Sequence, residues 1–272
     1  MPELPEVETI KRDLEKAINN KNIVEVCVFK PKIIKEPDIA KFKRILTGAR
    51  FLKVARRGKL LILKIQARNK QVLFLTIHLR MSGQLVFGAK SPSSRLCFKL
   101  SDKKYLSYND QRLLGEVRLV HDWRKLKLIC AMGPEPLDKT FTREKFQKRI
   151  AERTGKVKAV LLDQKFIAGL GNIYAAEVLF HSRINPMRQI NTLDNSEIGG
   201  LFRNIKKILN NAIICRGTSF SDYRDGKGNR GDFFKKLSVY GRAGQACRRC
   251  KNEIERIKLG GRGTYFCGRC QR

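Results

Sequence analysis

Apolar residues recur at helical spacing close to the start of the chain. Between Pro5 and Ile18 they fall every three or four residues, which predicts a helix that begins near Pro5. Proline suits a first helical turn, because its missing N–H would have no partner there. Two residues that precede this helix, Pro2 and Glu3, are not explained by the apolar pattern.

The pattern then changes to short segments with the alternation that is typical of strands. Glycines and other turn residues separate these segments. Many short strands at this spacing predict a sandwich or a barrel. The predicted strands are Ile23–Lys30, Arg50–Arg56, Leu60–Gln66, Gln71–Leu79, Arg95–Leu100, Lys104–Tyr108 and Glu116–Val120.

A helical period returns after a proline-containing break at residues 133–137. Residues 217–232 are rich in Gly, Ser, Asp and Arg and read as a mobile loop. We therefore expect an α+β chain with divisions at 1–132, 133–238 and 239–272. The predicted helices of the second half are Phe141–Ile150, Lys156–Asp163, Asn172–Phe180 and Asn195–Cys215.

Four cysteines near the end of the chain form two closely spaced pairs. Cys247-x-x-Cys250 is followed, after sixteen residues, by Cys267-x-x-Cys270, which fits the spacing of a four-cysteine zinc site. Four thiolates leave no open coordination position, so we expect one structural Zn²⁺. The residues between the pairs can form a hairpin whose tip carries Arg262, a side chain suited to bind a phosphate with two parallel hydrogen bonds.

The charge of the chain indicates its class of partner. Lysine and arginine number 58 against 25 aspartates and glutamates, a formal net charge of +33. Such an excess favours a polyanion, with nucleic acid first and an anionic membrane surface second. We find no apolar run of about 18 residues and no signal-peptide pattern, and so expect a cytoplasmic protein without a spanning helix. Nothing in the sequence indicates oligomerisation, and we expect a monomer.

Pro2 and Glu3 have a chemical interpretation if Met1 is removed. The new N-terminus is then a secondary amine with a pKa near ~8, lower beside a helix N-terminus. A neutral amine can attack C1′ of a sugar, and the iminium ion that forms is an electron sink for elimination. Glu3 could move protons during ring opening. The plainer interpretation is that Met-Pro is only a start and a helix cap.

Several motifs match one known family in order along nearly the whole chain. The segments MPELPEVET, RRGKLLIL (56–63), IHLRMSGQL (77–85), GPEPL (133–137), LDQKFIAGLGNIYAAEVLF (162–180) and VYGRAGQACRRC (239–250) resemble the bacterial formamidopyrimidine-DNA glycosylases of the Fpg/Nei family. The resemblance implies an N-terminal helix with a catalytic β-sandwich, a helix–two-turns–helix domain and a C-terminal zinc finger. Double-stranded DNA with oxidised bases or abasic sites would lie in a basic cleft between the domains.

The implied activity is that of a bifunctional DNA glycosylase and abasic-site lyase of base-excision repair. It would remove formamidopyrimidines and 8-oxoguanine opposite cytosine through a Schiff base on Pro2, with β- and δ-elimination. Glu3 would assist ring opening, and Glu6 would position water or the helix start. The resemblance assigns catalytic roles to Pro2, Glu3, Lys59 and Arg262, and DNA contacts to His78, Met81, Arg112, Leu114, Lys158, Asn172 and Tyr240.

One departure from the family pattern concerns the residues that fill the gap left by an extruded base. Relatives commonly read Asp-Pro-Arg-Arg-Phe-Gly where this chain reads Asp-Gln-Arg-Leu-Leu-Gly at 110–115. Met81 matches the residue that fills the void, and Arg112 the arginine that faces the estranged cytosine. Leu114 replaces the aromatic wedge and stacks less well than phenylalanine. In the loop 217–232, Thr218, Ser219 and Tyr223 are the candidates for contact with the damaged base.

Two other functions stay open at this point. The first is an endonuclease-VIII-like glycosylase for oxidised pyrimidines, which a panel of lesion duplexes would separate from the purine enzyme. The second is a non-catalytic, zinc-containing DNA-binding protein. Such a protein would need the charge and the zinc site, but it would not need Pro2 and Glu3.

Overall fold

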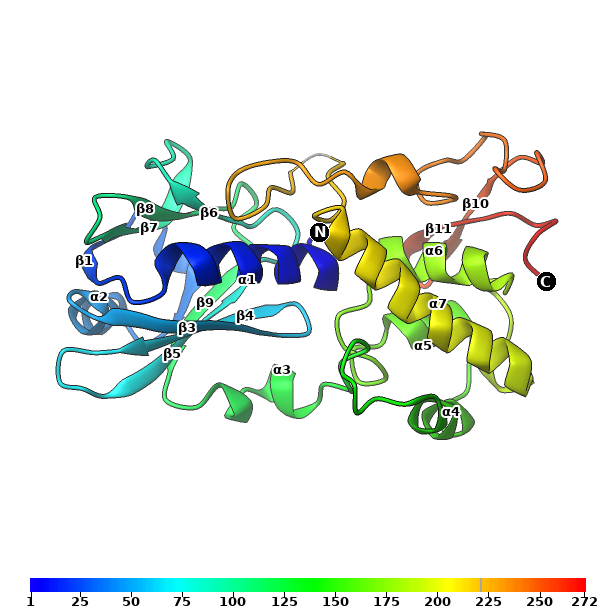
Figure 1. Cartoon of the computed structure of the whole chain (residues 1–272), viewed down its shortest axis with the longest axis horizontal. Coiled ribbons are helices and arrows are strands. Elements are labelled where there is room, and N and C mark those ends of the chain that lie inside the picture. The colour runs from blue at the N-terminus through cyan, green and yellow to red at the C-terminus, as the bar shows by residue number, and fades with distance from the viewer. Residues whose placement is uncertain (221) are drawn as a thin grey trace. The chain divides into compact units, whose positions relative to one another are not determined.

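The computed structural model describes residues 1–220 and 222–272. These residues form two compact units, of which the first combines Met1–Cys130 with Ile213–Phe234 and the second Ala131–Ala212 with Lys235–Arg272 (Figure 1). The segment Ile213–Phe234 thus belongs to the compact unit of the N-terminal half, although the expected boundaries place it with residues 133–238. The three-part division itself stays a prediction.

Helix α1 (Leu4–Ile18) begins one residue before the predicted start. Glu3 is its N-cap and Pro5 lies at the second helical position. The apolar face that the sequence pattern indicates is buried, since Val7, Ile10 and Leu14 have no exposed surface. Burial of this face against the sandwich holds the helix in place, because most helical stability in proteins comes from such packing.

The strands of the first unit form two sheets. One has the order β2-β9-β5-β4-β3 and the other β1-β7-β8-β6, and all neighbours are antiparallel except β2 and β9. The predicted bounds of β4 and β9 match the structure. The strands are β1 (Ile23–Val28), β2 (Ile34–Glu36), β3 (Arg50–Arg57), β4 (Leu60–Gln66), β5 (Val72–His78), β6 (Gln84–Gly88), β7 (Ser94–Leu100), β8 (Tyr105–Asn109) and β9 (Glu116–Val120).

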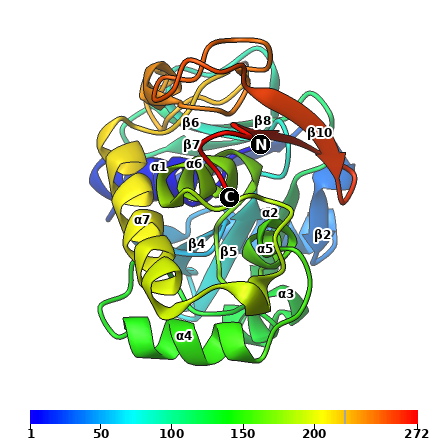
Figure 2. The same ribbon diagram turned by 90° about the vertical axis from the view of Figure 1, so that its right-hand side faces the viewer.

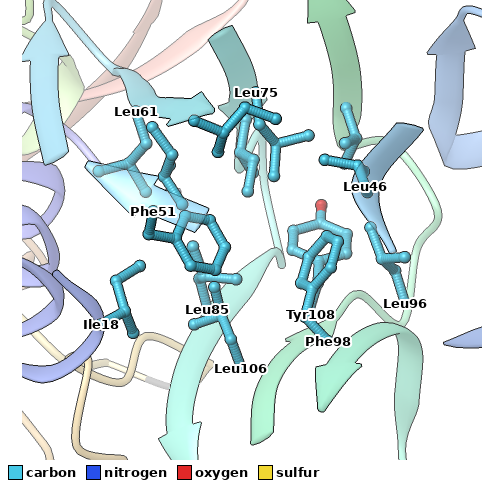
Figure 3. Packing of buried hydrophobic residues seen from close by; sticks show 14 of the residues in the cluster. Ile18, Leu46, Phe51, Leu61, Leu75, Leu85, Leu96, Phe98, Leu106 and Tyr108 are labelled. Atoms are coloured by element: carbon cyan, nitrogen blue, oxygen red, sulfur yellow. The ribbon is translucent and has the colours of Figure 1, made fainter. Parts of the chain in front are cut away.

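Apolar side chains from both sheets meet in one core, which confirms the predicted sandwich (Figure 3). Phe51 from one sheet packs edge-on against Phe98 from the other, with ring centroids 6.4 Å apart. Helix α2 (Ile39–Leu46), which the sequence analysis missed, closes one side of this core with Phe42 and Leu46. A short helix α3 (Lys127–Cys130) ends the first stretch of the unit.

The second unit is helical and ends in a hairpin (Figure 2). Its aromatic core contains Phe141, Phe146, Phe166 and Phe202, whose rings lie 5.5 to 6.1 Å from their neighbours. No helix within the described ranges is both long and apolar enough to cross a membrane. The elements are α4 (Arg143–Ala151), α5 (Val157–Leu162), α6 (Asn172–Ser182), α7 (Asn195–Ile214), β10 (Glu255–Leu259) and β11 (Arg262–Phe266), with a one-turn helix at Ile190–Thr192. Two further one-turn helices, Pro31–Ile33 and Trp123–Lys125, belong to the first unit, and a third, Phe233–Lys236, spans the division between the units in the sequence.

Candidate nucleic-acid interface

The start of α1 is a buried, hydrogen-bonded structure. Pro2 is buried, and Glu3 is only 2% exposed. The backbone N–H of Glu3 donates to Glu6 Oε2 (2.8 Å), and the backbone N–H of Thr218 donates to Glu6 Oε1 (2.8 Å). The carboxylate of Glu6 therefore joins the helix start to the segment that follows α7. Of the two roles expected for Glu6, this geometry matches that of holding the helix start.

The turn that carries Lys59 is held near α1 by an ion pair between Arg56 and Glu8. Lys59 lies in the two-residue turn between β3 and β4, after Gly58 with its φ of 55°. Arg56 donates from Nε to Glu8 Oε2 on α1 (3.0 Å) and from Nη1 to the carbonyl of Gly58 (2.8 Å). Burial would raise the pKa of Glu8, but hydrogen bonds from Arg12 and Arg56 outweigh it and lower that pKa. The charged carboxylate thus fixes the turn that carries Lys59.

His78 ends β5 at the same end of the sheet. It lies opposite Leu60 of β4 and Glu116 of β9. Burial, together with the positive charges of Arg80 and Lys59, lowers the pKa of His78 to about 4. The imidazole is therefore neutral at pH 7, and its Nδ1 accepts the backbone N–H of Arg80 (3.1 Å). A contact of His78 with DNA would be a hydrogen bond from Nε2 rather than an ion pair.

The ion pairs of Glu116 predict that the free energy of unfolding depends on pH. Burial would raise the pKa of Glu116, but hydrogen bonds from Arg118 and Arg80 lower it to about 2, against 4.5 unperturbed. A carboxyl whose folded pKa is depressed stabilises the fold above its unfolded pKa and loses that effect as pH falls. We expect Glu116→Gln to lower the free energy of unfolding at pH 7 by about 1 kcal/mol. This difference from the parent protein should shrink as pH falls from about 4.5 towards about 2.

Urea unfolding of both proteins across that pH range measures the difference. Glu36→Gln is the matched control, because Glu36 also pairs with Arg118 (3.2 Å) but its side chain is 48% exposed. The control should have a smaller effect at every pH. A destabilisation by Glu116→Gln that does not change with pH would contradict the role of the ion pairs.

A buried carboxylate brings the predicted gap-filling residues together. Asp110, 1% exposed, accepts from Ser82 Oγ (2.6 Å) and from the backbone N–H of Gly115 (2.7 Å). Ser82 Oγ in turn accepts the backbone N–H of Arg112 (3.3 Å). Through Asp110, the loop that carries Met81 is bonded to the loop 111–114.

Both loops present exposed side chains, as a wedge requires. Met81 is 42% and Leu114 45% exposed, and Arg112 is exposed as well. Gly115 leaves no room for a side chain, because a Cβ there would lie 1.6 Å from Tyr108 Oη of β8. The structure thus brings together the three residues that sequence reasoning assigned to base extrusion, while their function stays a prediction.

The segment 213–234 is tied to α1 along its length. Arg216 donates from Nε to Asp225 (2.7 Å) and forms an ion pair with Asp13 (2.5 Å). The backbone N–H of Gly226 also donates to Asp13 (3.1 Å). A mobile loop was expected over 217–232, but Thr218 near its start is bonded to Glu6 and Gly226 in its middle to Asp13, and both of these acids of α1 are buried. The expectation missed these bonds because Asp13 lies about two hundred residues away in sequence.

The three residues of this segment that were predicted to contact the damaged base are buried in the fold. Thr218, Ser219 and Tyr223 are all buried. Ser219 Oγ donates to the carbonyl of Tyr223 (2.8 Å), and the Tyr223 hydroxyl donates to the carbonyl of Arg216 (3.1 Å). Among the described residues of the loop, the exposed large apolar side chain is that of Phe220, which is 49% exposed. Contact of Thr218, Ser219 or Tyr223 with a damaged base stays a prediction.

In the second unit, two predicted DNA contacts converge on the zinc hairpin. Lys158, 1% exposed, donates from Nζ to Thr264 Oγ1 (2.6 Å) and to the carbonyl of Gly263 (3.2 Å). Asn172, the first residue of α6, donates from Nδ2 to the same carbonyl (3.0 Å). Both side chains therefore hold the backbone next to Arg262. A direct contact of Lys158 or Asn172 with phosphate stays a prediction.

Glu177 anchors the segment that leads to the hairpin. This carboxylate, 1% exposed, accepts the backbone N–H groups of Ser238 (2.8 Å), Val239 (2.9 Å) and Tyr240 (2.9 Å). Burial raises the pKa of Glu177, and these three hydrogen bonds oppose that rise. The ring of Tyr240 lies 5.0 Å from that of Tyr265 on β11. Tyr240 thus packs on the hairpin, and its predicted DNA contact is untested.

The four cysteines fit a tetrahedral metal site. Their Sγ atoms all lie within 4.8 Å of one another, with 3.9 Å between Cys247 and Cys270 and 3.5 Å between Cys250 and Cys267. A Zn–S bond of about 2.3 Å in a tetrahedron places sulfurs about 3.8 Å apart. The donor set is thiolate only, so these residues would hold one structural Zn²⁺. Strands β10 and β11 form the predicted hairpin, and Arg262 is the first residue of β11, exposed and opposite Leu259 next to the turn.

The acidic residues that position this interface were not predicted. They are Glu8, Asp13, Asp110 and Glu177, and each binds groups distant in sequence or in another loop. Asp13 carries a signal that could have been used, because it adjoins Leu14 on the apolar face of α1. An acid on a buried face of so basic a chain indicates an internal ion pair.

Models of three domain families match the chain. The formamidopyrimidine-DNA glycosylase N-terminal domain matches residues 1–117, and the formamidopyrimidine-DNA glycosylase H2TH domain matches residues 132–224. The zinc finger found in FPG and IleRS matches residues 244–272.

Whole proteins match over the full length as well. The formamidopyrimidine-DNA glycosylase of Pelotomaculum thermopropionicum is 42% identical over 278 residues, which cover 100% of this chain and 99% of the relative. The crystal structure of the MutM (Fpg) protein of Thermus thermophilus has a TM-score of 0.88 at 34% identity and covers 99% of this chain and 98% of that one. A complex of wild-type Lactococcus lactis Fpg with DNA that contains N7-benzyl-Fapy-dG has a TM-score of 0.90 at 36% identity, with 100% of both chains covered.

Proposed function

The chain belongs to the formamidopyrimidine-DNA glycosylase family, and from this premise we propose that it removes oxidised purines from double-stranded DNA in base-excision repair. Its substrates are formamidopyrimidines and 8-oxoguanine opposite cytosine, and it also cleaves abasic sites as a lyase. The similarity to Fpg structures in complex with Fapy-dG DNA and with abasic-site DNA supports both substrates. The relatives are bacterial, and we place the protein as a monomer on the chromosome in the cytoplasm.

The proposed nucleophile is the nitrogen of Pro2, freed by removal of Met1. It lies just before the positive end of α1, where a neutral amine is favoured over its protonated form. The nitrogen attacks C1′, the glycosidic bond breaks, and the base leaves with a proton. The C1′–O4′ bond then opens, with Glu3 supplying the proton to O4′. The iminium ion allows loss of a C2′ proton, and the 3′ and then the 5′ phosphate leave.

The other predicted residues bind and deform the duplex. We propose that Lys59 contacts the phosphate beside the lesion, and that Arg262 and Asn172 contact further phosphates. Met81, Arg112 and Leu114 would fill the gap after extrusion, as apolar wedges and arginines do in other proteins that distort DNA. The observation that supports this assignment is that Asp110 accepts hydrogen bonds from Ser82 and Gly115, and so joins the two loops that carry these exposed side chains.

A panel of lesion duplexes with borohydride reduction tests the proposed function. We expect strong cutting of 8-oxoguanine opposite cytosine and a covalent protein–DNA adduct after reduction. Cutting of thymine-glycol duplexes alone would favour the endonuclease-VIII-like alternative. Binding of damaged duplex without any adduct would favour a non-catalytic zinc protein, because only the enzyme passes through an imine.

Arg262→Ala tests the role of the hairpin tip. We expect weaker DNA binding with little dependence on the base, and a slope of log K against log salt that is smaller by about one. Titrations of one duplex at several salt concentrations measure this slope. Lys258→Ala is the matched control, since Lys258 is exposed and its neighbour Leu259 is the one that pairs with Arg262. If Arg262→Ala left the slope unchanged, the phosphate contact would be wrong.

A further inference from the structure

The sandwich has a second basic end, opposite the end that carries Lys59 and His78. The strand register places Arg50, Gln66 and Val72 side by side at this second end. Seven residues of strand at about 3.3 Å each separate the two ends by about 23 Å. We call the loops at this second end the distal cluster, which consists of residues 19–22, 43–50, 67–71 and 101–104 (Figure 1).

The distal cluster is strongly and almost purely basic. Its single acid, Asp102, pairs with Lys21 at 2.5 Å. The other basic residues of the cluster make no ion pair with a carboxylate in the described part of the chain. Uncompensated charges gathered on one surface attract polyanions and raise their rate of association. The cluster contains eight basic side chains, which are Lys21, Lys43, Arg44, Arg50, Arg68, Lys70, Lys103 and Lys104.

The loops of the cluster are bonded into one surface. Arg50 Nε donates to the carbonyl of Asn20 (3.2 Å), and the backbone N–H of Ser101 donates to the carbonyl of Asn22 (3.0 Å). The guanidinium of Arg68 lies on Gly48, where a Cβ would come within 1.9 Å of its Nε. These contacts hold the loops and the side chains of Arg50 and Arg68 in a fixed arrangement, which lowers the cost of ordering them on a ligand.

A hollow of about 350 Å³ lies within the cluster, between α2 and the β4–β5 turn. It is lined by Arg44, Arg68, Asn69 and Gln71 among others. Guanidinium and amide N–H groups are among the donors that bind phosphate oxygens. The chemistry of the hollow therefore fits a phosphodiester backbone.

We propose that the distal cluster binds the backbone of a second DNA duplex while a first is held at the α1 end. This inference rests on the proposed function for its first duplex. Binding is independent of sequence, because the nearby aromatic ring, Phe87, is covered by Lys21 (4.5 Å) and Lys104 (5.5 Å) and cannot stack on bases. An anionic membrane is disfavoured, since the exposed large apolar side chains within two residues of the described cluster are only two valines, Val24 and Val72. By binding two duplexes at once, the protein can transfer directly from one DNA segment to another.

A bridging experiment tests this proposal. A bead-bound duplex with an uncleavable abasic-site analogue is loaded with one equivalent of the full chain, and capture of a labelled, undamaged duplex is measured. We expect capture that falls steeply with salt. The variant Lys43→Gln, Lys70→Gln, Lys103→Gln should weaken capture about tenfold or more and lower the salt slope by about two to three. Retention on the bead-bound duplex should be unchanged.

The control variant Lys139→Gln, Lys148→Gln, Lys207→Gln removes the same charge from exposed positions of the second unit and should capture like the parent protein. Equal capture by all three proteins would overturn the proposal. Loss of retention on the first duplex, with no second duplex captured by the parent, would assign the cluster to the first duplex instead. Competition by phosphatidylglycerol vesicles but not by free duplex would point to a membrane and contradict it. A parallel borohydride trap reports separately on the proposed function.

Discussion

Protein that retains Met1 is expected to bind lesion duplexes normally and to lose both base excision and strand cleavage. With Met1 in place, the nitrogen of Pro2 is a tertiary amide whose lone pair is delocalised into the carbonyl, so it cannot attack C1′. Loss of a nucleophile lowers turnover by about a thousandfold or more. Borohydride trapping and nicking of an 8-oxoguanine duplex measure this, with N-terminal sequencing to establish the fraction of each form.

Treatment of the same sample with methionine aminopeptidase is the matched control. Activity should rise in proportion to the fraction of chains that begin at Pro2. The buried start of α1 gives no reason for a change in fold, because the bond from Glu3 to Glu6 and that from Thr218 to Glu6 do not involve Met1. A fully active, trappable sample in which every chain keeps Met1 would exclude Pro2 as the nucleophile.

The sequence predicts well those parts of the structure that depend on neighbouring residues. The bounds of β4 and β9 agree with the structure, and α1 agrees within one residue, because their apolar periods are regular and their ends carry turn or cap residues. The cysteine spacing likewise predicts the thiolate cluster, since two tight turns on a hairpin suffice to build it. Helix α2 was missed, because its eight residues are too few to give a clear period beside the strands.

The parts that could not be predicted depend on pairs remote in sequence. Residues Asp13 and Arg216 are separated by 203 positions, and Lys158 and Thr264 by 106. Nothing local distinguishes Lys158, a buried structural ammonium, from the exposed lysines of the same basic chain. Such partners follow from the topology, which a single sequence does not determine.

In the candidate site, too, local motifs could be predicted from the sequence, whereas contacts between distant residues could not. Met81, Arg112 and Leu114 were found from their motifs, but the bonds from Asp110 that join their loops depend on tertiary structure. For Leu114 this has a consequence, because a leucine held at a fixed place can still occupy the gap without the stacking of an aromatic ring. The wedge is therefore set by the position of the loop as well as by the side chain.

Removal of zinc is expected to unfold the β10–β11 hairpin and to abolish lesion cutting. A two-stranded hairpin is at best marginally stable alone. The small core beneath it includes two of the ligands, Cys247 and Cys267, among only a few apolar residues. Metal binding in such sites supplies about 10–16 kcal/mol, which is also folding energy. Without it, Arg262 is no longer fixed, and the bonds from Lys158 and Asn172 to Gly263 are lost.

Three measurements on a chelator-treated sample report separately on the metal, the hairpin and the activity. Zinc per chain should fall from one to zero, and amide exchange should rise over residues 244–272 while that of β4 and β5 stays slow. Excision of 8-oxoguanine should fall by at least about a hundredfold, as expected when several binding groups are displaced together. Cys267→Ser should reproduce this state, whereas Cys130→Ser, at an exposed thiol outside the cluster, should not. Full activity at verified zero zinc would mean that the hairpin folds by its apolar contacts alone, and the phosphate role of Arg262 would then need no metal.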